Sequence, residues 1–238
     1  MEYAQKLSII IPSYNEEKTI IALLDKVIRV RLIDDTQKEL IIIDDGSKDA
    51  TSRLVTEYMQ NHPYETIKLI SHEINQGKGM AIRTGIEKAT GDFIIIQDAD
   101  LEYDPEDYNL LLPALISRHA PVIYGSRFLM KENRHSYTSF YYGGLLVTAV
   151  TNILYGQHLT DEPTCYKAFD SKLLKSIPLR CTGFEFCPEV TAKVAKRGIV
   201  IKEIPIHYYP RSIGEGKKIR WTDGLFAIWT LLKYRFTN

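Results

Sequence analysis

Two aspartates stand one residue apart at the end of a short apolar run. Asp98 and Asp100 follow residues 93–96, and Gly91 bounds the run on its other side. This pattern predicts a buried strand that delivers both carboxylates to the carboxyl edge of a sheet, where open α/β folds bind their ligands. Carboxylate oxygens suit Mg²⁺ or Mn²⁺, which reach many proteins through one or two carboxylates and substrate phosphates. The alternative is a pair of acids that only caps a turn.

The composition is that of an ordinary globular chain with no net charge. The 238 residues are enough for one large domain or two small ones, and 45% of them are hydrophobic. Lys+Arg and Asp+Glu are both 30, so we expect no nucleic acid partner. The 3 cysteines lack a Cys-x-x-Cys spacing, which argues against zinc. With no recognisable targeting segment at the N-terminus, this cysteine usage predicts a cytoplasmic protein.

A second acidic strand end follows residues 40–43. There Asp44 can accept hydrogen bonds from a base or ribose, while Asp45 either shares that role or makes the turn before Gly46. The first expected strand, residues 7–11, stops at Pro12 and lacks the glycine motifs of dinucleotide or triphosphate loops. The sequence therefore offers neither of these two phosphate-binding loops.

Two basic residues are candidates for binding phosphate. Lys78 lies between glycines in residues 75–79, ahead of an expected helix at 80–89, where backbone N–H groups and a cation could meet an anion. Arg127 directly follows an expected strand at 122–126. Its planar fork could bind a phosphate or form a salt bridge with one of the acids.

The expected elements alternate through the first half and predict a mostly parallel α/β sheet with helices on its faces. In the second half we expect a helix or helix pair at 137–155, a strand or turn at 163–169, a helix at 185–196 and a strand at 199–208. Residues 136–160 carry no charge but are too polar to span a membrane, although they could face lipid. The amphipathic segment 221–236 packs on its own domain or docks at a membrane interface.

Four linked motifs carry a resemblance to a known family. In order they are residues 9–16 (IIIPSYNE), 43–47 (IDDGS), 75–79 (NQGKG) and 97–100 (QDAD). Together they resemble the inverting glycosyltransferases of the GT-A fold, in the family of dolichol-phosphate mannose synthases and bacterial polyprenyl-phosphate sugar transferases. The resemblance implies a Rossmann-like, mostly parallel sheet in one domain, 1–238. Residues 1–128 would bind the nucleotide sugar, and 129–238 would bind the acceptor and end in the amphipathic helix.

The resemblance also implies roles for individual residues. Asp98 would lie against the sugar nucleotide, and Asp100 would bind a Mg²⁺ or Mn²⁺ ion with help from Asp98 and Glu102, the last replacing a glutamine of the mannose-synthase branch. The remaining implied site residues are Pro12, Tyr14, Glu16, Asp44, Asp45 and Lys78 at the nucleotide, and Arg127, Arg211 and Lys217 at phosphate. Residues 164–167 (TCYK) depart from the family's usual Thr-Ser-Gly-Phe-Arg.

The implied reaction is hexosyl transfer from a nucleotide diphosphate sugar, such as GDP-mannose or a UDP-sugar. A polyprenyl phosphate acceptor, at the cytoplasmic face of a membrane, is already ionised near neutral pH and needs no base. Transfer to a sugar hydroxyl of a glycan would need one, and Glu185 is the candidate because many family members carry an acid there. Glu185 could equally be a helix-start acid. A rival of another class is a nucleotide-sugar-binding module without catalysis.

Overall fold

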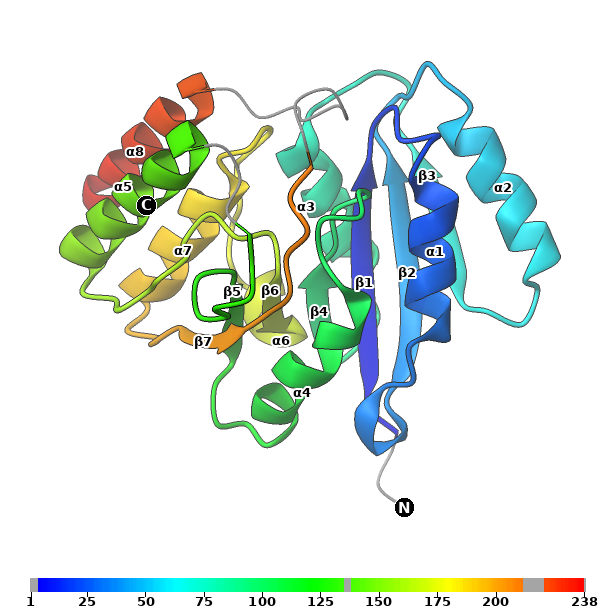
Figure 1. Ribbon diagram of the computed structural model, residues 1–238, viewed down its shortest axis with the longest axis horizontal. Coiled ribbons are helices and arrows are strands. Elements are labelled where there is room, and N and C mark those ends of the chain that lie inside the picture. The colour runs from blue at the N-terminus through cyan, green and yellow to red at the C-terminus, as the bar shows by residue number, and fades with distance from the viewer. Residues whose placement is uncertain (1–3, 135–137, 212–220, 238) are drawn as a thin grey trace.

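The computed structural model describes residues 4–134, 138–211 and 221–237 of the chain (Figure 1). Helices and strands alternate, with two short 3₁₀ helices labelled η. In chain order the elements are β1 (Lys6–Ser13), α1 (Ile20–Arg29), η1 (Ile33–Asp35), β2 (Gln37–Asp44), α2 (Thr51–Asn61), β3 (Ile67–Ser71), α3 (Lys78–Lys88), β4 (Phe93–Ile96), η2 (Pro105–Asp107), α4 (Tyr108–Ile116), β5 (Val122–Ser126), α5 (Thr138–Tyr155), β6 (Lys167–Asp170), α6 (Ser171–Lys175), α7 (Phe186–Lys196), β7 (Lys202–Pro205) and α8 (Trp221–Phe236).

The described strands form one sheet in the order β3-β2-β1-β4-β6-β5-β7. β6 runs antiparallel to its neighbours β4 and β5, and the other pairs are parallel. The expected α/β class with a mostly parallel sheet is confirmed. Because β1, β2 and β4 are adjacent and parallel, their carboxyl ends meet at one edge of the sheet. The acidic motifs at the ends of β2 and β4 therefore lie at that edge.

The central strands are buried on both faces, which explains their runs of isoleucine. Ile9, Ile10 and Ile11 of β1 are fully buried. In Figure 1, α1 lies in front of the sheet and α3 behind it. α3 packs so closely that a Cβ on Gly85 would lie 2.4 Å from the Ile10 side chain. A larger residue at that position would push the helix from the sheet.

A three-helix group of α5, α7 and α8 packs beside the β5–β7 end of the sheet (Figure 1). Its own apolar cluster contains Val147, Ala192, Leu231 and Tyr234. Residues 138–155 form one helix, so the helix pair considered from the sequence is excluded. No helix within the described ranges is both long and apolar enough to cross a membrane.

Some boundaries differ from those expected. β7 spans four residues of the expected strand at 199–208, because the chain from Ile206 onwards leaves the sheet. β6 begins at Lys167, inside the segment expected as strand or turn. The five-residue helix α6 was not expected, since one helical turn is too short to show a hydrophobic period.

A buried carboxylate braces the sheet at the end opposite the acidic motifs. Glu39 of β2 accepts hydrogen bonds from Ser8 (2.6 Å), from the Thr90 backbone N–H (2.6 Å) and from Lys68 (2.9 Å). Burial alone would raise the pKa of Glu39, but these donors outweigh it and lower the pKa to about 2. The charged side chain therefore stabilises the folded state.

We expect Glu39→Gln to reduce the free energy of unfolding by about 2–3 kcal/mol at pH 7. Because the folded-state pKa lies below the ordinary value of 4.5, the carboxylate's contribution is present above pH 4.5 and is lost as pH falls towards 2. Urea unfolding across that range should show the difference between wild type and variant shrinking. Glu57→Gln, in an exposed pair with Arg53, is the control and should change stability by less than about 0.5 kcal/mol. Equal losses in both variants would contradict the assignment.

Candidate active site

A cleft of about 1110 Å³ opens at the carboxyl edge of the sheet. Its walls come from the ends of β1, β2, β4 and β5, the start of α3, the segment after β7, and helices α5 and α8. Ten of the residues singled out from the sequence line it: Pro12, Tyr14, Glu16, Asp45, Lys78, Asp98, Asp100, Glu102, Arg127 and Arg211. Asp44 and Glu185 do not line it, and Lys217 lies outside the described residues.

The acids after β4 are each paired with a cation from another part of the chain. Asp98 forms an ion pair with Lys78, at the first position of α3. Asp100 accepts a 2.5 Å hydrogen bond from Arg211 Nη2, and Arg211 Nε lies 3.8 Å from Glu102. All three acids have mostly buried side chains. The three acids thus lie together in one segment after β4, and basic side chains from other parts of the chain offset part of their negative charge.

The two aspartates differ in their electrostatic surroundings. Burial raises the pKa of Asp100 to about 7, with the Asp98 and Glu102 carboxylates adding to the rise and Arg211 opposing it. Burial also opposes ionisation of Asp98, but Lys78 outweighs it and lowers the pKa of Asp98. A further positive charge near Asp100 would therefore stabilise its ionised form.

The donor set suits a hard divalent ion. The Asp98 and Glu102 carboxylates lie close enough to Asp100 to add to the rise that burial causes in the pKa of Asp100, and a cation would oppose that rise. Among the described residues, no three carboxylate, histidine or cysteine side chains form a ready-made metal cage. Mg²⁺ commonly binds through one or two carboxylates with the rest of its shell from substrate and water, so this arrangement fits such an ion.

The segment after β7 carries Arg211 to the acids by running antiparallel to the chain after β4. Tyr208 forms a bridge with Tyr103, the Tyr209 N–H donates to the Glu102 carbonyl (2.8 Å), and the Arg211 N–H donates to the Glu102 carboxylate (2.9 Å). Tyr208 also donates its hydroxyl to Glu102 at 3.2 Å. Sequence reasoning missed Tyr208 because its role depends on a partner more than a hundred residues away.

The loops after β1 and β2 interlock beside the cleft. Asn15, at a φ of 52°, donates its N–H to Ser47 (2.9 Å), and its side chain accepts from the Lys48 N–H (2.8 Å). The Glu16 N–H donates to Thr51 at 2.9 Å. These bonds fix the backbone that presents Pro12, Tyr14 and Glu16 to the cleft.

Of the two aspartates at the end of β2, Asp45 lines the cleft and Asp44 does not. The Asp45 carboxylate accepts the backbone N–H groups of Gln76 (2.9 Å) and Gly77 (2.8 Å) and the Nδ1–H of His72 (2.7 Å). His72 is fixed in turn by Thr84 at Nε2, 3.0 Å away. Asp45 therefore anchors the glycine-rich loop, and His72, which the sequence analysis did not select, supports it. A nucleotide-binding role for Asp44 stays a prediction.

The glycines around Lys78 allow another stretch of chain to cross the start of α3. A Cβ on Gly77 would lie 2.3 Å from the Thr182 carbonyl oxygen, and one on Gly79 would lie 2.7 Å from that of Gly183. The Met80 N–H donates to Thr182 at 3.1 Å. Together with the bonds to Asp45, this contact gives several N–H groups protein partners where the sequence suggested an anion. Lys78 remains the part of the motif that reaches the cleft.

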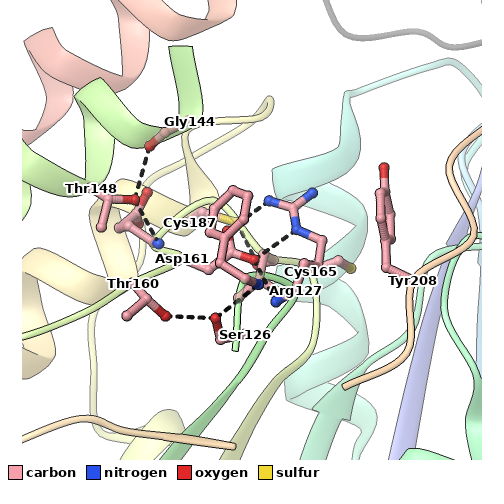
Figure 2. Close-up of polar contacts among 12 residues, drawn as sticks. Ser126, Arg127, Gly144, Thr148, Thr160, Asp161, Cys165, Cys187 and Tyr208 are labelled. Carbon is pink, nitrogen blue, oxygen red and sulfur yellow. Dashed lines mark hydrogen bonds and ion pairs between the residues drawn. The ribbon is translucent and has the colours of Figure 1, made fainter. Parts of the chain in front are cut away.

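Arg127 pairs with an acid that sequence analysis did not select. Its Nε and Nη2 donate to the two oxygens of Asp161, both at 2.7 Å (Figure 2). The Tyr208 ring lies 5.1 Å from the guanidinium carbon on the other side. Arg127 thus forms a salt bridge, as one of the two alternatives predicted, but its partner is Asp161 and not one of the acids selected from the sequence. Asp161 is the first charged residue after the uncharged stretch 136–160, and that position was the available signal.

Glu185 precedes α7 and braces its own loop. Its carboxylate accepts the backbone N–H groups of Thr182 (2.7 Å) and Gly183 (3.0 Å). The neighbouring Phe184 and Phe186 line the cleft. Its side chain makes no capping bond to α7, so these contacts indicate an acid that holds the loop before the helix. A catalytic role for Glu185 stays a prediction.

Comparison with known proteins gives concordant matches. The model of glycosyl transferase family 2 matches residues 8–177. A UDP-N-acetylglucosamine–dolichyl-phosphate N-acetylglucosaminyltransferase of Methanococcus voltae is 31% identical over 243 residues, covering 94% of this chain and 95% of that protein. A dolichyl-phosphate beta-glucosyltransferase of Dictyostelium discoideum is 33% identical over 225 residues, 85% of this chain. The aligned region is 66% of that enzyme, so the chain matches just under two thirds of its length.

The fold is shared with a solved enzyme of low sequence identity. Glucosyl-3-phosphoglycerate synthase of Mycobacterium tuberculosis, crystallised with Mn²⁺, uridine diphosphate and phosphoglyceric acid, superposes with a TM-score of 0.72 at 19% identity. The superposition covers 98% of this chain and 80% of that one. At this identity the likeness establishes the GT-A fold.

We expect Gly77→Ala to lower the free energy of unfolding by at least about 2 kcal/mol, because its φ of 93° and the close Thr182 carbonyl both exclude a side chain. Gly143→Ala is the control, since a Cβ there meets nothing within 4 Å and a helical glycine gains about 0.5–1 kcal/mol from the change. Urea unfolding of the two variants makes the comparison. A Gly77→Ala protein as stable as wild type would show that the crossing at α3 is not tight.

Proposed function

Because the chain belongs to glycosyl transferase family 2, we propose that it is an inverting, metal-dependent glycosyltransferase that transfers a hexosyl group from a nucleotide diphosphate sugar to a polyprenyl phosphate. The names of the Methanococcus and Dictyostelium relatives, both dolichyl-phosphate glycosyltransferases, support this acceptor. The donor base and sugar are left open by these names, since one relative transfers N-acetylglucosamine and the other glucose.

One observation carries the proposal: a single cleft has a charged end and an apolar end. The charged end contains the three acids after β4 and the cations Lys78, Arg127 and Arg211. The mainly apolar end lies between α5 and α8, where small and aromatic residues line it: Phe140, Tyr141, Gly143, Gly144, Val147, Gly224 and Ala227. Ser139, Thr222 and Asp223 of the same helices also line the cleft. A phosphate attached to a hydrocarbon chain has the same division between a charged head and an apolar tail.

The charged end suits the donor diphosphate. Breaking the bond between the anomeric carbon and the diphosphate leaves negative charge on the leaving group, and Lys78 and Arg211 would stabilise it. A Mg²⁺ or Mn²⁺ ion held by Asp100, with Asp98 and Glu102, would neutralise more of that charge. The mycobacterial synthase with Mn²⁺ and uridine diphosphate supports this assignment. Lys217 remains a proposed phosphate ligand.

The two parts of the chain would divide the substrates. Residues 1–128 supply Pro12, Tyr14, Glu16 and Asp45 around the proposed nucleoside pocket, with Asp44 beside them. Residues 129–238 supply the apolar end and Arg211. This division supports a single domain in which donor and acceptor meet at the acids after β4.

A lipid phosphate acceptor removes the need for a catalytic base. Its oxygen is largely ionised near neutral pH and can attack the anomeric carbon directly from the face opposite the diphosphate, which inverts the configuration. The contacts of Glu185 with its own loop agree with this, because its carboxylate accepts N–H groups of Thr182 and Gly183 and the residue does not itself line the cleft.

An exposed apolar surface lies on α5 and α8 and suits a membrane. Tyr142, Leu146 and Ile153 of α5 are exposed, as are Leu225, Phe226, Trp229, Leu232 and Phe236 of α8. The two helices pack against each other, and Lys233 and Arg235 follow near the C-terminal end. Such a mixture favours peripheral binding at an interface. The three free cysteines suit the cytoplasmic side, where thiols stay reduced.

Transfer assays with radiolabelled GDP- and UDP-sugars, Mn²⁺ and a polyprenyl phosphate test the function. We expect label in the organic phase with wild type and with Glu185→Gln, whose rate should stay within about threefold. Asp100→Asn should lower the rate at least about 100-fold, because it removes the proposed charge at the metal and leaving group. Thermal unfolding of both variants checks that the fold is kept.

The opposite pattern identifies the alternative reaction. Loss of transfer in Glu185→Gln, with a saccharide accepted and the lipid phosphate refused, would assign a sugar hydroxyl as acceptor and Glu185 as base. Unchanged turnover in Asp100→Asn would defeat the metal role. Nucleotide binding without transfer to either acceptor would favour the non-catalytic module.

Substitutions on α8 test the membrane surface. Phe226→Asp with Trp229→Asp should reduce binding to anionic phospholipid vesicles at least about tenfold, because each aromatic side chain contributes about 1.5–3 kcal/mol on burial. Tyr64→Asp is the control, since Tyr64 is 99% exposed in the turn between α2 and β3, across the sheet from α8. Flotation of all three proteins gives the bound fractions. Equal loss in the control, or none in the double variant, would contradict a docking role for α8.

A further inference from the structure

Arg127 and Asp161 form a dedicated pair next to the cleft. Asp161 Oδ2 accepts both the backbone N–H (3.0 Å) and the Nε–H (2.7 Å) of Arg127, and Oδ1 accepts Nη2 (2.7 Å). The Asp161 side chain is fully buried, whereas that of Arg127 is 19% exposed and lines the cleft. One end of this pair is therefore sealed in protein and the other faces ligand space.

The pairing leaves a defined edge of the guanidinium. Arg127 has five N–H donors in one plane, and Asp161 takes one from Nε and one from Nη2. Of the other three, one on Nη1 and one on Nη2 form the adjoining edge, and the third, on Nη1, points back along the side chain. The Tyr208 hydroxyl also forms a hydrogen bond with the guanidinium. Two parallel donors on such an edge match two oxygens of a phosphate group. Asp161 thus determines which edge of Arg127 is available.

Asp161 is fixed by its own neighbours. Glu203 of β7 accepts the backbone N–H groups of Thr160 (2.6 Å) and Asp161 (2.9 Å). On the other side, the N–H of Glu162 donates to Thr148 of α5 at 3.0 Å, and Thr148 donates to the Gly144 carbonyl at 2.9 Å (Figure 2). The segment that carries Asp161 is therefore held to the sheet and to α5 at once.

The second side of Arg127 is also constrained. The Tyr208 ring lies 5.1 Å from the guanidinium carbon, on the side away from Asp161 in Figure 2. The Asn133 side chain links the two backbones: it donates to the carbonyls of Arg127 and Ile206 (both 2.8 Å) and accepts the Tyr208 N–H (2.9 Å). Arg127 is thereby limited to one orientation.

From this geometry we infer that Asp161 is a positioning residue, which turns the Nη1–Nη2 edge of Arg127 towards a phosphate group bound in the cleft. The inference rests on the proposed function for the presence of that phosphate. That phosphate group could belong to either of two substrates: the diphosphate of the donor or the phosphate monoester of the acceptor.

Orientation and charge make opposite predictions for substitutions at Asp161. Asp161→Asn removes a negative charge beside Arg127, so the site becomes more positive and would bind phosphate more tightly if charge alone mattered. Its amide donors would also face those of Arg127 and turn the guanidinium. Asp161→Glu keeps the charge but displaces the carboxylate by one methylene group. If orientation matters, both variants bind phosphate more weakly.

The test is equilibrium binding with the full chain. UDP with Mn²⁺ probes the donor phosphate by calorimetry, and a short-chain polyprenyl phosphate in detergent probes the acceptor phosphate. We expect Kd for at least one of them to rise about tenfold or more in both Asp161 variants, and the affected ligand identifies the phosphate that Arg127 binds. Asp107→Asn is the matched control. Asp107 is a buried acid that accepts the N–H (2.6 Å) and Nδ1–H (2.8 Å) of His207, next to Tyr208, but does not contact Arg127. It should change either Kd by less than threefold.

Three outcomes would overturn the inference. These are unchanged Kd values for both ligands in the Asp161 variants, tighter binding in Asp161→Asn with no change in Asp161→Glu, and an equal loss in Asp107→Asn. If Asp161→Asn does not fold, Asp161→Glu decides alone, because unchanged Kd values in that variant would reject orientation. These binding readouts are independent of turnover. A wild-type protein that binds both ligands without transferring sugar would contradict the proposed function and leave the test of Asp161 intact.

Discussion

Mutual repulsion among buried carboxylates is the constraint on which the site depends. Asp98, Asp100 and Glu102 leave the end of β4 within five residues of one another and are largely withdrawn from water. The charged forms are tolerated because Lys78 comes from the start of α3 and Arg211 from the segment after β7. Burial, together with the Asp98 and Glu102 carboxylates, still raises the pKa of Asp100 to about 7, so the nearby cations do not offset these effects fully. A site with residual negative charge and basic residues at its rim favours both a divalent ion and the phosphates that such an ion bridges.

The architecture explains how distant segments meet there. The parallel strands β1, β2 and β4 end at one edge, and the antiparallel β6 connects them to β5 and β7. The chain after β7 then returns along the residues that follow β4 and brings Tyr208 and Arg211 to the acids. Helices α5 and α8 extend the same cleft into an apolar groove. A donor diphosphate and a lipid phosphate could therefore approach the acids from different sides.

Several motif residues support the site through the backbone. Asp45 holds the loop before α3, and His72 holds Asp45. Gly77 and Gly79 leave room for the chain at Thr182 and Gly183 to cross that helix. Departures from the family pattern are also accommodated. Tyr166 stacks on Tyr103 and donates its hydroxyl to Gln97 at 2.6 Å, so a bulky residue fills the position where glycine is usual.

The sequence by itself determined the alternation of strands and helices and the sheet edge at which Asp98 and Asp100 emerge. Those features follow from hydrophobic period and turn residues, which are properties of neighbours along the chain. Of the ten selected residues that line the cleft, Pro12, Tyr14, Glu16, Glu102 and Arg211 were implied only by the resemblance to a known family. Only the tertiary structure decided the partners: Arg127 binds Asp161, 34 residues away, and Arg211 binds Asp100, 111 residues away. Periodicity cannot specify such pairs, because an ion pair requires two side chains within about 4 Å, and that separation is set by how the elements pack. For the same reason, the burial that raises the pKa of Asp100 exists only in the folded chain.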